Sequence, residues 1–208
     1  MEENLIKILA EFEKLKGQFV LTDSWKVERL IAIVKDLDLI SKLESADLSL
    51  NKEPFDVVEL VQNVFELLEM KAKKRNITLT FNKKYRLPVM AIGDEERIEQ
   101  VLTNLLVNSI KYGKIDGNTT VSIEPLRKNK ILVKVTDDGE GIEAKHMPRI
   151  FERFYRVDSS RSREQGGSGL GLAIVKHIIE AHDEAIFAES EFKKGSPFSF
   201  TLEKFEPV

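Results

Sequence analysis

Residues 166–182 read GGSGLGLAIVKHIIEAH, so that a glycine-rich segment leads directly into an apolar run. The run predicts a helix from about Leu170 to Ala181. A helix start offers unpaired backbone N–H groups and the positive end of the helix dipole, which together bind anions. A Walker loop would need a Lys-Ser or Lys-Thr pair, and a Rossmann fingerprint would need a preceding strand. The segment therefore predicts a phosphate-binding loop of another kind.

A second glycine pair lies upstream in VTDDGEGI, residues 135–142, after an alternating stretch that predicts a strand. Glycines two positions apart let the backbone approach a flat ligand closely. A carboxylate at a strand end, here Asp137, can accept a hydrogen bond from an exocyclic amine. A simple turn would use the same residues, so this segment alone leaves both interpretations open. Six of the eleven glycines fall between Gly139 and Gly171, which indicates that the two halves of the chain do different jobs.

Further upstream, the pattern predicts a helix from about residue 95 to residue 112, with Asp94 as its N-cap. At about 100° per residue its apolar side chains gather on one face, and polar side chains form a stripe beside that face. An exposed helix edge is the plain interpretation of this stripe. The functional interpretation is a carboxamide oxygen for Mg²⁺ and a lysine that reaches a phosphate. The stripe consists of Asn104, Asn108 and Lys111, with Tyr112 at its edge.

The remaining pattern predicts an α+β fold. An apolar stripe with Pro54 near its first turn predicts a helix that stops at Asn76. Its last turn carries the basic run KAKKR (71–75), which suits the helix dipole; a nucleic-acid patch is the alternative. Pairs of strands with short connections separate the helices, which favours an α+β sandwich over a doubly wound parallel sheet. The predicted strands lie near residues 77–81, 89–92, 119–124, 131–136, 185–189 and 198–202.

The first 50 residues form a separate unit in this interpretation. Apolar residues recur at helical spacing from Leu5 to Leu15 and again from Val27 to Leu37, which predicts a helical hairpin. A hairpin this small buries little surface by itself, so we expect it to pack on the rest of the chain or on a second copy. The predicted division is a hairpin at 1–50 and a larger domain at 51–208.

Composition excludes several classes of function. The 208 residues carry a net charge of −3, which argues against a nucleic-acid binder that works through a basic surface. The absence of cysteine excludes disulfide frameworks, thiolate zinc sites and cysteine nucleophiles. No run reaches the roughly 18 apolar residues that span a bilayer, and the acidic N-terminus is unlike a signal peptide, so we expect a soluble, cytoplasmic chain.

Four segments together resemble the boxes named N, G1, F and G2 in the catalytic domain of sensor histidine kinases. That domain belongs to the ATPase superfamily shared with gyrase and a heat-shock chaperone, and the resemblance covers about residues 54–202. It implies a two-layer α/β sandwich, with residues 27–45 similar to the second helix of the family's dimerisation domain. Aromatic and charged residues at 151–165, bracketed by glycines, predict a lid. The four strings are EQVLTNLLVNSIKYG, VTDDGEGI, FERFYRVD and GGSGLGLAIVKHIIEAH.

Carried over position by position, the resemblance implies a site for ATP and Mg²⁺. Asn108 would coordinate Mg²⁺, and Asn104 would line the same pocket. Lys111 and Arg156 would contact the triphosphate and, with Asn108, serve catalysis; Tyr112 would lie near the adenine. The other implied contacts are Asp137 with the adenine amino group, Gly139, Gly141 and Ile142 around the base, and Ser168, Gly169, Leu170 and Gly171 on the phosphates through backbone amides.

Two features depart from the family pattern. The triplet His182-Asp183-Glu184 stands where the family usually has His-Gly-Gly, which leaves the geometry of that turn open. The phospho-acceptor histidine motif is missing, because residues 4–18 contain no histidine. We expect packing or surface roles for the three histidines of the chain, His146, His177 and His182.

The resemblance implies a kinase unit that transfers the γ-phosphoryl group of ATP to a histidine outside this chain. The simplest source of that histidine is an upstream part of the same polypeptide, and the next acceptor would be the receiver domain of a response regulator. A homodimeric, membrane-anchored full-length protein is also implied, and the chain alone is not expected to phosphorylate itself. Two alternatives stay open: a nucleotide-binding regulatory module without transfer, and an ATPase of the gyrase or chaperone type.

Overall fold

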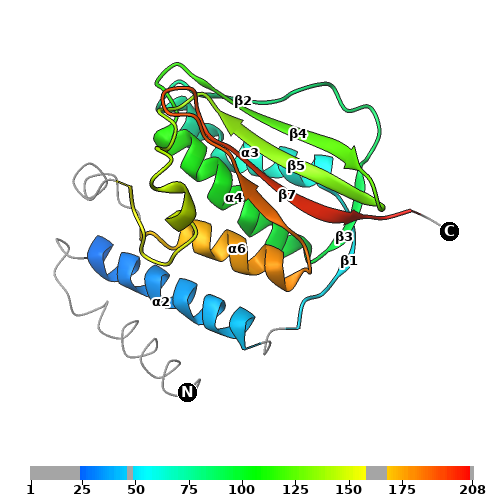
Figure 1. Cartoon of the computed structure of the whole chain (residues 1–208), viewed down its shortest axis with the longest axis horizontal. Helices are drawn as coiled ribbons and strands as arrows, with labels where there is room; N and C mark the ends of the chain where they lie inside the picture. Colours follow the sequence, from blue (N-terminus) through cyan, green and yellow to red (C-terminus); the bar gives the residue numbers. More distant parts are fainter. Residues whose placement is uncertain (1–23, 46–48, 158–167, 207–208) are drawn as a thin grey trace.

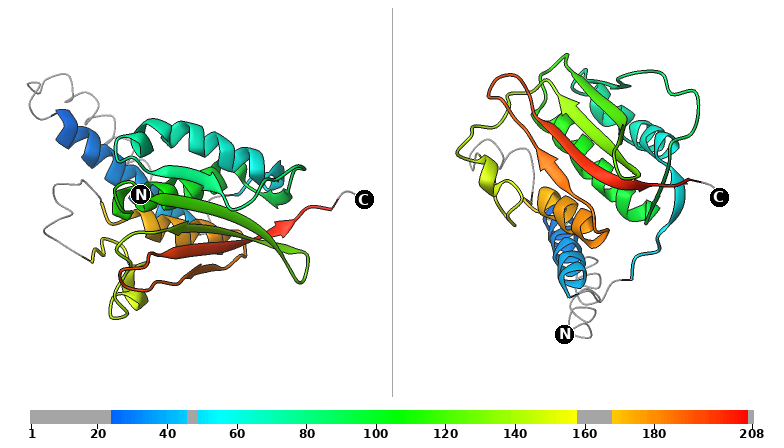
Figure 2. Two further views of the ribbon diagram at one scale, coloured as in Figure 1. Left: turned by 90° about the horizontal axis from the view of Figure 1, so that it is seen from above. Right: turned by 45° about the vertical axis from the view of Figure 1, so that its right-hand side comes forward.

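The computed structural model describes residues 24–45, 49–157 and 168–206 and shows a mixed α and β fold (Figure 1). Helices cover one face of a single sheet, which confirms the two-layer α+β sandwich (Figure 2). The elements are α2 (Ser24–Glu44), β1 (Glu53–Asp56), α3 (Val57–Lys73), β2 (Thr78–Phe81), β3 (Met90–Gly93), α4 (Glu95–Tyr112), β4 (Asn118–Leu126), β5 (Lys130–Asp137), a 3₁₀ turn (Met147–Arg149), α6 (Gly171–Ala181), β6 (Ile186–Ala188) and β7 (Pro197–Lys204).

The sheet has the strand order β1-β3-β7-β5-β4-β2, and β6 pairs with β7. Its pairs are antiparallel except for β2 with β4, which run parallel. Alternate residues of β5 are buried, and Val133 and Phe200, which face each other in the register of β5 and β7, are both fully buried. The sheet is therefore mixed and mainly antiparallel, as the short strand connections predict, and it contributes one face to the core.

The helix that carries the polar stripe has the predicted bounds. Helix α4 runs from Glu95 to Tyr112, and the Asp94 carboxylate accepts a hydrogen bond from the Arg97 N–H at 3.1 Å. This bond satisfies one of the free N–H groups of the first turn, as expected of an N-cap. The apolar face of α4 is buried against the sheet and its neighbours, which fixes the rotation of the helix and hence the direction of its polar stripe. The buried members of that face include Ile98, Val101, Leu102, Leu105 and Leu106.

Pro54 lies near the start of α3, as predicted, but in a strand and outside the helix itself. Pro54 belongs to β1, which pairs with β3 at the edge of the sheet, where a residue without an N–H is tolerated. Helix α3 begins later because Asp56 is its N-cap and accepts from the Val58 N–H at 2.9 Å. The same carboxylate oxygen accepts from the Val89 N–H at 3.0 Å, so this cap also connects the start of α3 to the residue that precedes β3.

The second helix of the predicted hairpin is present as α2, whereas residues 5–15, the predicted first helix, lie outside the described residues. Ile40 of α2 is fully buried and Ile31 nearly so, and the helix packs against α6. The expected packing of this segment on the rest of the chain is confirmed for α2. Among the described helices, none combines the length and the apolar character that a membrane crossing requires.

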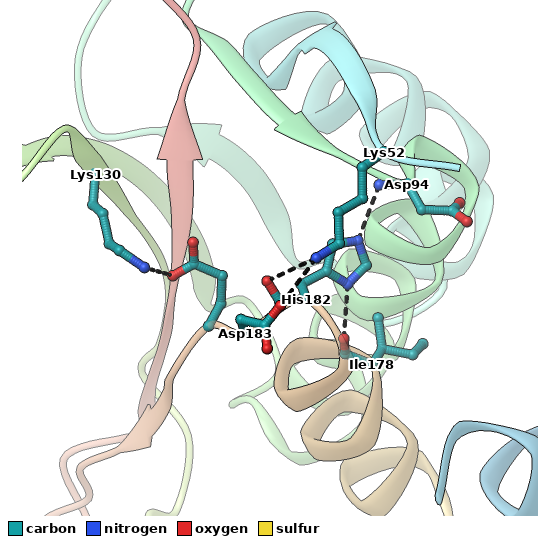
Figure 3. A network of polar contacts seen from close by, with 7 residues as sticks. Lys52, Asp94, Lys130, Ile178, His182 and Asp183 are labelled. Atoms are coloured by element: carbon teal, nitrogen blue, oxygen red, sulfur yellow. Dashed lines mark hydrogen bonds and ion pairs between the residues drawn. The ribbon is translucent and has the colours of Figure 1, made fainter. Parts of the chain in front are cut away.

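His182 organises the turn after α6 (Figure 3). Its Nε2 accepts a hydrogen bond from the Asp94 N–H at 2.9 Å, and its Nδ1 faces the Ile178 carbonyl at 2.8 Å. Asp183 adopts φ 63°, the left-handed conformation that glycine takes most readily. Lys52, from the segment between α2 and β1, lies 3.3 Å from both the His182 carbonyl and the Asp183 carboxylate. The turn therefore keeps a glycine-like shape without glycine, and the predicted packing role of His182 is confirmed.

Candidate functional site

The polar stripe of α4 faces the glycine-rich start of α6. Asn104 carries a buried amide nitrogen, Nδ2, that has no hydrogen-bond partner within the described part of the chain. Its Oδ1 lies beside the first residue of α6, because a Cβ atom on Gly171 would be 3.6 Å from it. The N-cap of α6 is Leu170, whose side chain forms no cap hydrogen bond. A buried donor without a partner next to an uncapped helix start suits an anionic ligand.

A second unpaired donor belongs to the segment after the 3₁₀ turn. The Phe154 N–H donates to the Gly169 carbonyl at 2.9 Å, which fastens this segment to the glycine-rich loop. Arg156 follows two residues later; its side chain is half-buried, and Nη2 is buried without a hydrogen-bond partner among the described residues. A guanidinium with a free N–H group is the donor best matched to a phosphate. Residues 158–165 of the predicted lid lie outside the described residues.

The loop after β5 is built by long-range contacts and is more than a simple turn. Gly139 packs so closely on the Tyr112 carbonyl that a Cβ atom there would be 2.5 Å from the oxygen. Gly141 has φ 69° and lies against the backbone of Glu191. The Ile142 N–H donates to Ser190 Oγ at 2.7 Å. These contacts require glycine at both positions, because a Cβ atom at either would collide with the backbone of another segment.

Asp137 is the buried carboxylate of this loop, with 9% of its surface exposed. One oxygen accepts from the Gly139 N–H at 2.8 Å. Burial raises the pKa of the Asp137 carboxyl above its usual value, while the Gly139 and Ser196 N–H groups act in the opposite direction. In such a buried, poorly solvated position, a hydrogen bond to the carboxylate is stronger than in water.

The end of α4 brings the other predicted residues toward this loop. Lys111 Nζ stands 5.0 Å from the centre of the Tyr112 ring, and the ring is about half exposed. Asn108 is half-buried one turn before Lys111. The Tyr112 carbonyl touches Gly139, so the end of α4 packs directly on the Asp137 loop. Neither Lys111 nor Arg156 forms an ion pair with a carboxylate among the residues that the structure describes.

The glycine-rich loop also contains an internal bond. Ser168 Oγ accepts from the Leu170 N–H at 3.2 Å, so this amide is already paired, whereas we expected it to face a phosphate. A ligand at the loop would exchange this bond for its own. Leu170 itself is fully buried, and its side chain anchors the loop to the core.

The last residue of α2 contacts the segment between the 3₁₀ turn and Arg156, which we call the site segment. Glu44 forms an ion pair with Arg153, and His177 Nε2 of α6 lies 3.4 Å from the same carboxylate oxygen. The Arg153 hydrogen bond lowers the pKa of the Glu44 carboxyl below its usual value. His146 in turn meets the Tyr155 hydroxyl through Nδ1 at 2.6 Å. His146 and His177 therefore have packing or surface roles, as predicted. His146 contacts Tyr155 of the segment that leads to Arg156, and His177 shares the Glu44 carboxylate with Arg153 of that segment.

Sequence reasoning missed the residues that support the loop from a distance. Ser190 Oγ donates to the Gly195 carbonyl at 3.0 Å and lies 2.9 Å from Ser196 Oγ. Gly195 has φ 118° and sits directly on the backbone of Asp137. The KKGS string at 193–196 indicates a turn, but the string itself does not show that this turn packs against the backbone of Asp137.

Replacing Gly169 with alanine is expected to destabilise the ligand-free chain by about 1–2 kcal/mol. Gly169 has φ 77°, and an added Cβ atom would lie 2.9 Å from the Phe154 backbone. Thermal unfolding measures the loss. Gly171→Ala is the matched control, because the new Cβ would meet Asn104 Oδ1 at an ordinary 3.6 Å. Equal unfolding temperatures for the two variants would contradict the described loop geometry.

The fold is that of an ATPase domain. The family model described as "Histidine kinase-, DNA gyrase B-, and HSP90-like ATPase" matches residues 93–206. The chain belongs to this family, whose ATPase domains bind ATP.

Among the similar proteins are sensor kinases named WalK. The chain is 36% identical over 193 residues to the sensor histidine kinase WalK of Bacillus subtilis (strain 168), which covers 92% of this chain and 31% of that protein. It is 34% identical over 192 residues to a sensor protein kinase WalK of Staphylococcus aureus, and the match covers 91% of this chain and 45% of that protein. The chain thus spans between about a third and a half of these relatives. It is a sensor histidine kinase ATPase domain.

Two solved structures support the same assignment over almost the whole chain. The Acinetobacter baumannii histidine kinase AdeS superposes with a TM-score of 0.70 at 26% identity, covering 98% of this chain and 97% of that chain. Full-length ShkA, in complex with AMPPNP, gives a TM-score of 0.81 at 25% identity, covering 99% of this chain and 46% of that chain. Both coverages include α2 as well as the sandwich.

Proposed function

We propose that this chain binds Mg²⁺ and ATP and transfers the γ-phosphoryl group to a histidine outside residues 1–208, for relay to the receiver domain of a response regulator. The observation that carries the proposal is a pair of buried donors without partners among the described residues. Asn104 Nδ2 belongs to a side chain beside the start of α6, and Arg156 Nη2 belongs to the segment that Phe154 fastens to the glycine-rich loop. The similar ShkA structure is a complex with AMPPNP, an ATP analogue, which supports a nucleotide as the ligand.

The residues divide into a base end and a phosphate end. Asp137 would accept the adenine amino group, with Gly139, Gly141, Ile142 and the Tyr112 ring around the base. Asn104, Lys111, Arg156 and the backbone of Ser168, Gly169, Leu170 and Gly171 would contact the triphosphate. Phosphoryl transfer needs positioning and charge neutralisation more than covalent chemistry, and these residues supply both.

The donor set suits Mg²⁺ held together with a nucleotide. The described residues contain no group of three or more His, Cys, Asp or Glu side chains that would hold a metal ion by themselves. Mg²⁺ usually keeps few protein ligands and completes its shell with phosphate oxygens and water. Asn108, half-buried on the stripe of α4, would supply the protein oxygen. The bound ion would neutralise charge on the phosphates during transfer.

We further propose that residues 1–50 are a stem that pairs with a second copy, and that residues 51–208 are the catalytic unit. The buried contacts of α2 with α6 and the Glu44–Arg153 ion pair support a stem that reaches the site segment. The resemblance to sensor kinases supports a homodimeric, membrane-anchored full-length protein with this unit on the cytoplasmic side.

Phosphoryl transfer tests the proposal. The chain is mixed with a separate dimerisation domain of a related kinase that carries the acceptor histidine, and labelled ATP is added with Mg²⁺. We expect acid-labile label on the acceptor and none on His146, His177 or His182. ATP binding without transfer at any acceptor concentration would indicate a regulatory module. ATP turnover in the absence of an acceptor would indicate an ATPase of the gyrase or chaperone type.

Replacing Asn108 with alanine is expected to reduce the gain in ATP affinity that Mg²⁺ provides by about tenfold, because the ion loses its protein oxygen. Calorimetric titrations with ATP, once with Mg²⁺ and once with EDTA, measure this gain for the wild type and for Asn108→Ala. Thr103→Ala, a half-buried neighbour on α4, is the matched control and should keep the full gain. An unchanged Mg²⁺ effect in Asn108→Ala would exclude the assigned ligand.

A further inference from the structure

Arg75 is the one cation of the basic run at 71–75 that is not exposed. Lys71, Lys73 and Lys74 are exposed, and Lys73 pairs with Glu69 one turn earlier. Arg75 lies after the C-cap of α3, in the turn that leads to β2, and its side chain is half-buried. The helix dipole of α3 therefore does not account for it.

The Arg75 guanidinium covers the end of α4. Its Nη1 donates to the Lys111 carbonyl, and its Nη2 donates to the Gly113 carbonyl at 3.1 Å. The last carbonyls of a helix have no partner within the helix, and a cation there also offsets the helix dipole. The backbone is tied as well, because the Asp116 N–H donates to the Arg75 carbonyl at 3.3 Å. Arg75 thus joins the α3–β2 turn to the last turn of α4 and to the loop that follows it.

The same end of α4 also contacts the loop after β5, which belongs to the proposed nucleotide site. The Tyr112 carbonyl, between the two carbonyls that Arg75 binds, touches Gly139 of the loop after β5. Lys111 and Tyr112 carry the side chains assigned to the triphosphate and the adenine. Their backbone is therefore held by a residue more than thirty positions upstream on one side and by the Asp137 loop on the other.

We propose that Arg75 is a positioning residue of the nucleotide site. By holding two carbonyls of the α4 end, it fixes the directions in which the Lys111 and Tyr112 side chains leave the helix. The planar guanidinium binds two acceptors with one rigid group, whereas a lysine ammonium would act as a single point charge on a flexible stem. The inference rests on the proposed function, since it assigns Arg75 to the same nucleotide site.

Calorimetric ATP binding with Mg²⁺ tests this role in three variants. We expect Arg75→Ala to bind about tenfold more weakly, because charge-assisted hydrogen bonds to the helix end are lost. Arg75→Lys should fall between Arg75→Ala and the wild type. Lys74→Ala removes a neighbouring exposed cation and should bind like the wild type. If Arg75→Ala binds ATP as the wild type does, the positioning role is excluded while the proposed function stands.

A double-mutant cycle separates positioning from general destabilisation. If Arg75 acts through Lys111, Arg75→Ala should weaken ATP binding much less in a Lys111→Ala background than in the wild type. Thermal unfolding without nucleotide confirms that each variant is folded at the temperature of the titration. Fully additive losses of affinity would overturn the inference. A wild-type chain that binds no ATP would overturn the proposed function and this role with it.

Discussion

Asp137→Asn is expected to weaken ATP binding by about 100-fold or more. One Asp137 oxygen accepts from the Gly139 N–H at 2.8 Å. In the proposed site the carboxylate also accepts from the adenine amine. An asparagine must place an NH₂ group at one of these two positions, where it meets another donor. With adenine bound, either orientation brings two donors together, so the variant loses the base contact while it keeps the size and shape of the side chain. Calorimetric titration with ATP measures the loss.

The same substitution should leave the ligand-free fold at least as stable at neutral pH. Burial raises the pKa of the Asp137 carboxyl above its usual 3.8, so the folded state binds its proton more tightly than the unfolded state does. The charged carboxylate therefore costs stability, and this cost grows as pH rises from 3.8 through the folded pKa. Asparagine removes it. We expect the unfolding temperature of the variant at neutral pH to equal or exceed that of the wild type.

Asp138→Asn is the matched control for this experiment. Asp138 is the next residue, but its carboxylate accepts from the Asn118 N–H at 3.0 Å and lies against Gly117. It should bind ATP close to the wild-type affinity. Similar losses in both variants would mean that negative charge in the loop, and no particular hydrogen bond, governs binding. Wild-type affinity in Asp137→Asn would remove Asp137 from the site.

Local signals in the sequence predicted the elements that carry the site. Helix α4 has its predicted bounds because Asp94 caps it and its apolar face is continuous. The turn at Lys128 and Asn129 lies where the strand pattern breaks, and both residues adopt left-handed φ values. These features depend on residues within a few positions of each other, which a pattern can register.

Other features depend on partners that are distant in the sequence. Pro54 suited a helix start as well as an edge strand, and the pairing of β1 with β3 decided between them. Ser190 and Gly195 support the Asp137 loop from beyond β6, and Arg75 reaches α4 from the end of α3. Such residues carry ordinary turn or surface patterns, because their function comes from contacts that only the fold brings together.

The departure at His182-Asp183 illustrates the same limit. The sequence showed that a glycine-favouring turn lacks glycine, but it did not show what compensates. In the structure Asp183 keeps φ 63°, and Lys52 pairs with its carboxylate and with the preceding carbonyl. The buried His182 ring connects this turn to the start of α4. The stability of the chain should therefore depend on this ring.

His182→Ala is expected to destabilise the chain by about 3 kcal/mol. The residue is only 6% exposed, and its ring fills the space beside Gly93, where a Cβ atom would lie 3.3 Å from Cδ2. Its removal leaves a cavity and the Asp94 N–H without its acceptor, while the Ile178 carbonyl keeps only the backbone N–H of residue 182. Denaturant unfolding measures the loss. His177→Ala, on the adjoining helix α6 but with 20% of its side chain exposed, is the control and should cost less.

The pH dependence gives this role a second signature. Burial lowers the pKa of His182 below its usual 6.5, with Lys52 acting in the same direction and the Ile178 carbonyl, Asp94 and Glu184 against it. The unfolded state then binds the proton more readily, so stability falls as pH drops below 6.5 toward the folded pKa. Protonation would also end acceptance of the Asp94 N–H by Nε2. Between about pH 7.5 and pH 5.5, we expect His182→Gln to lose less stability than the wild type, and equal losses would show that His182 is not the titrating group.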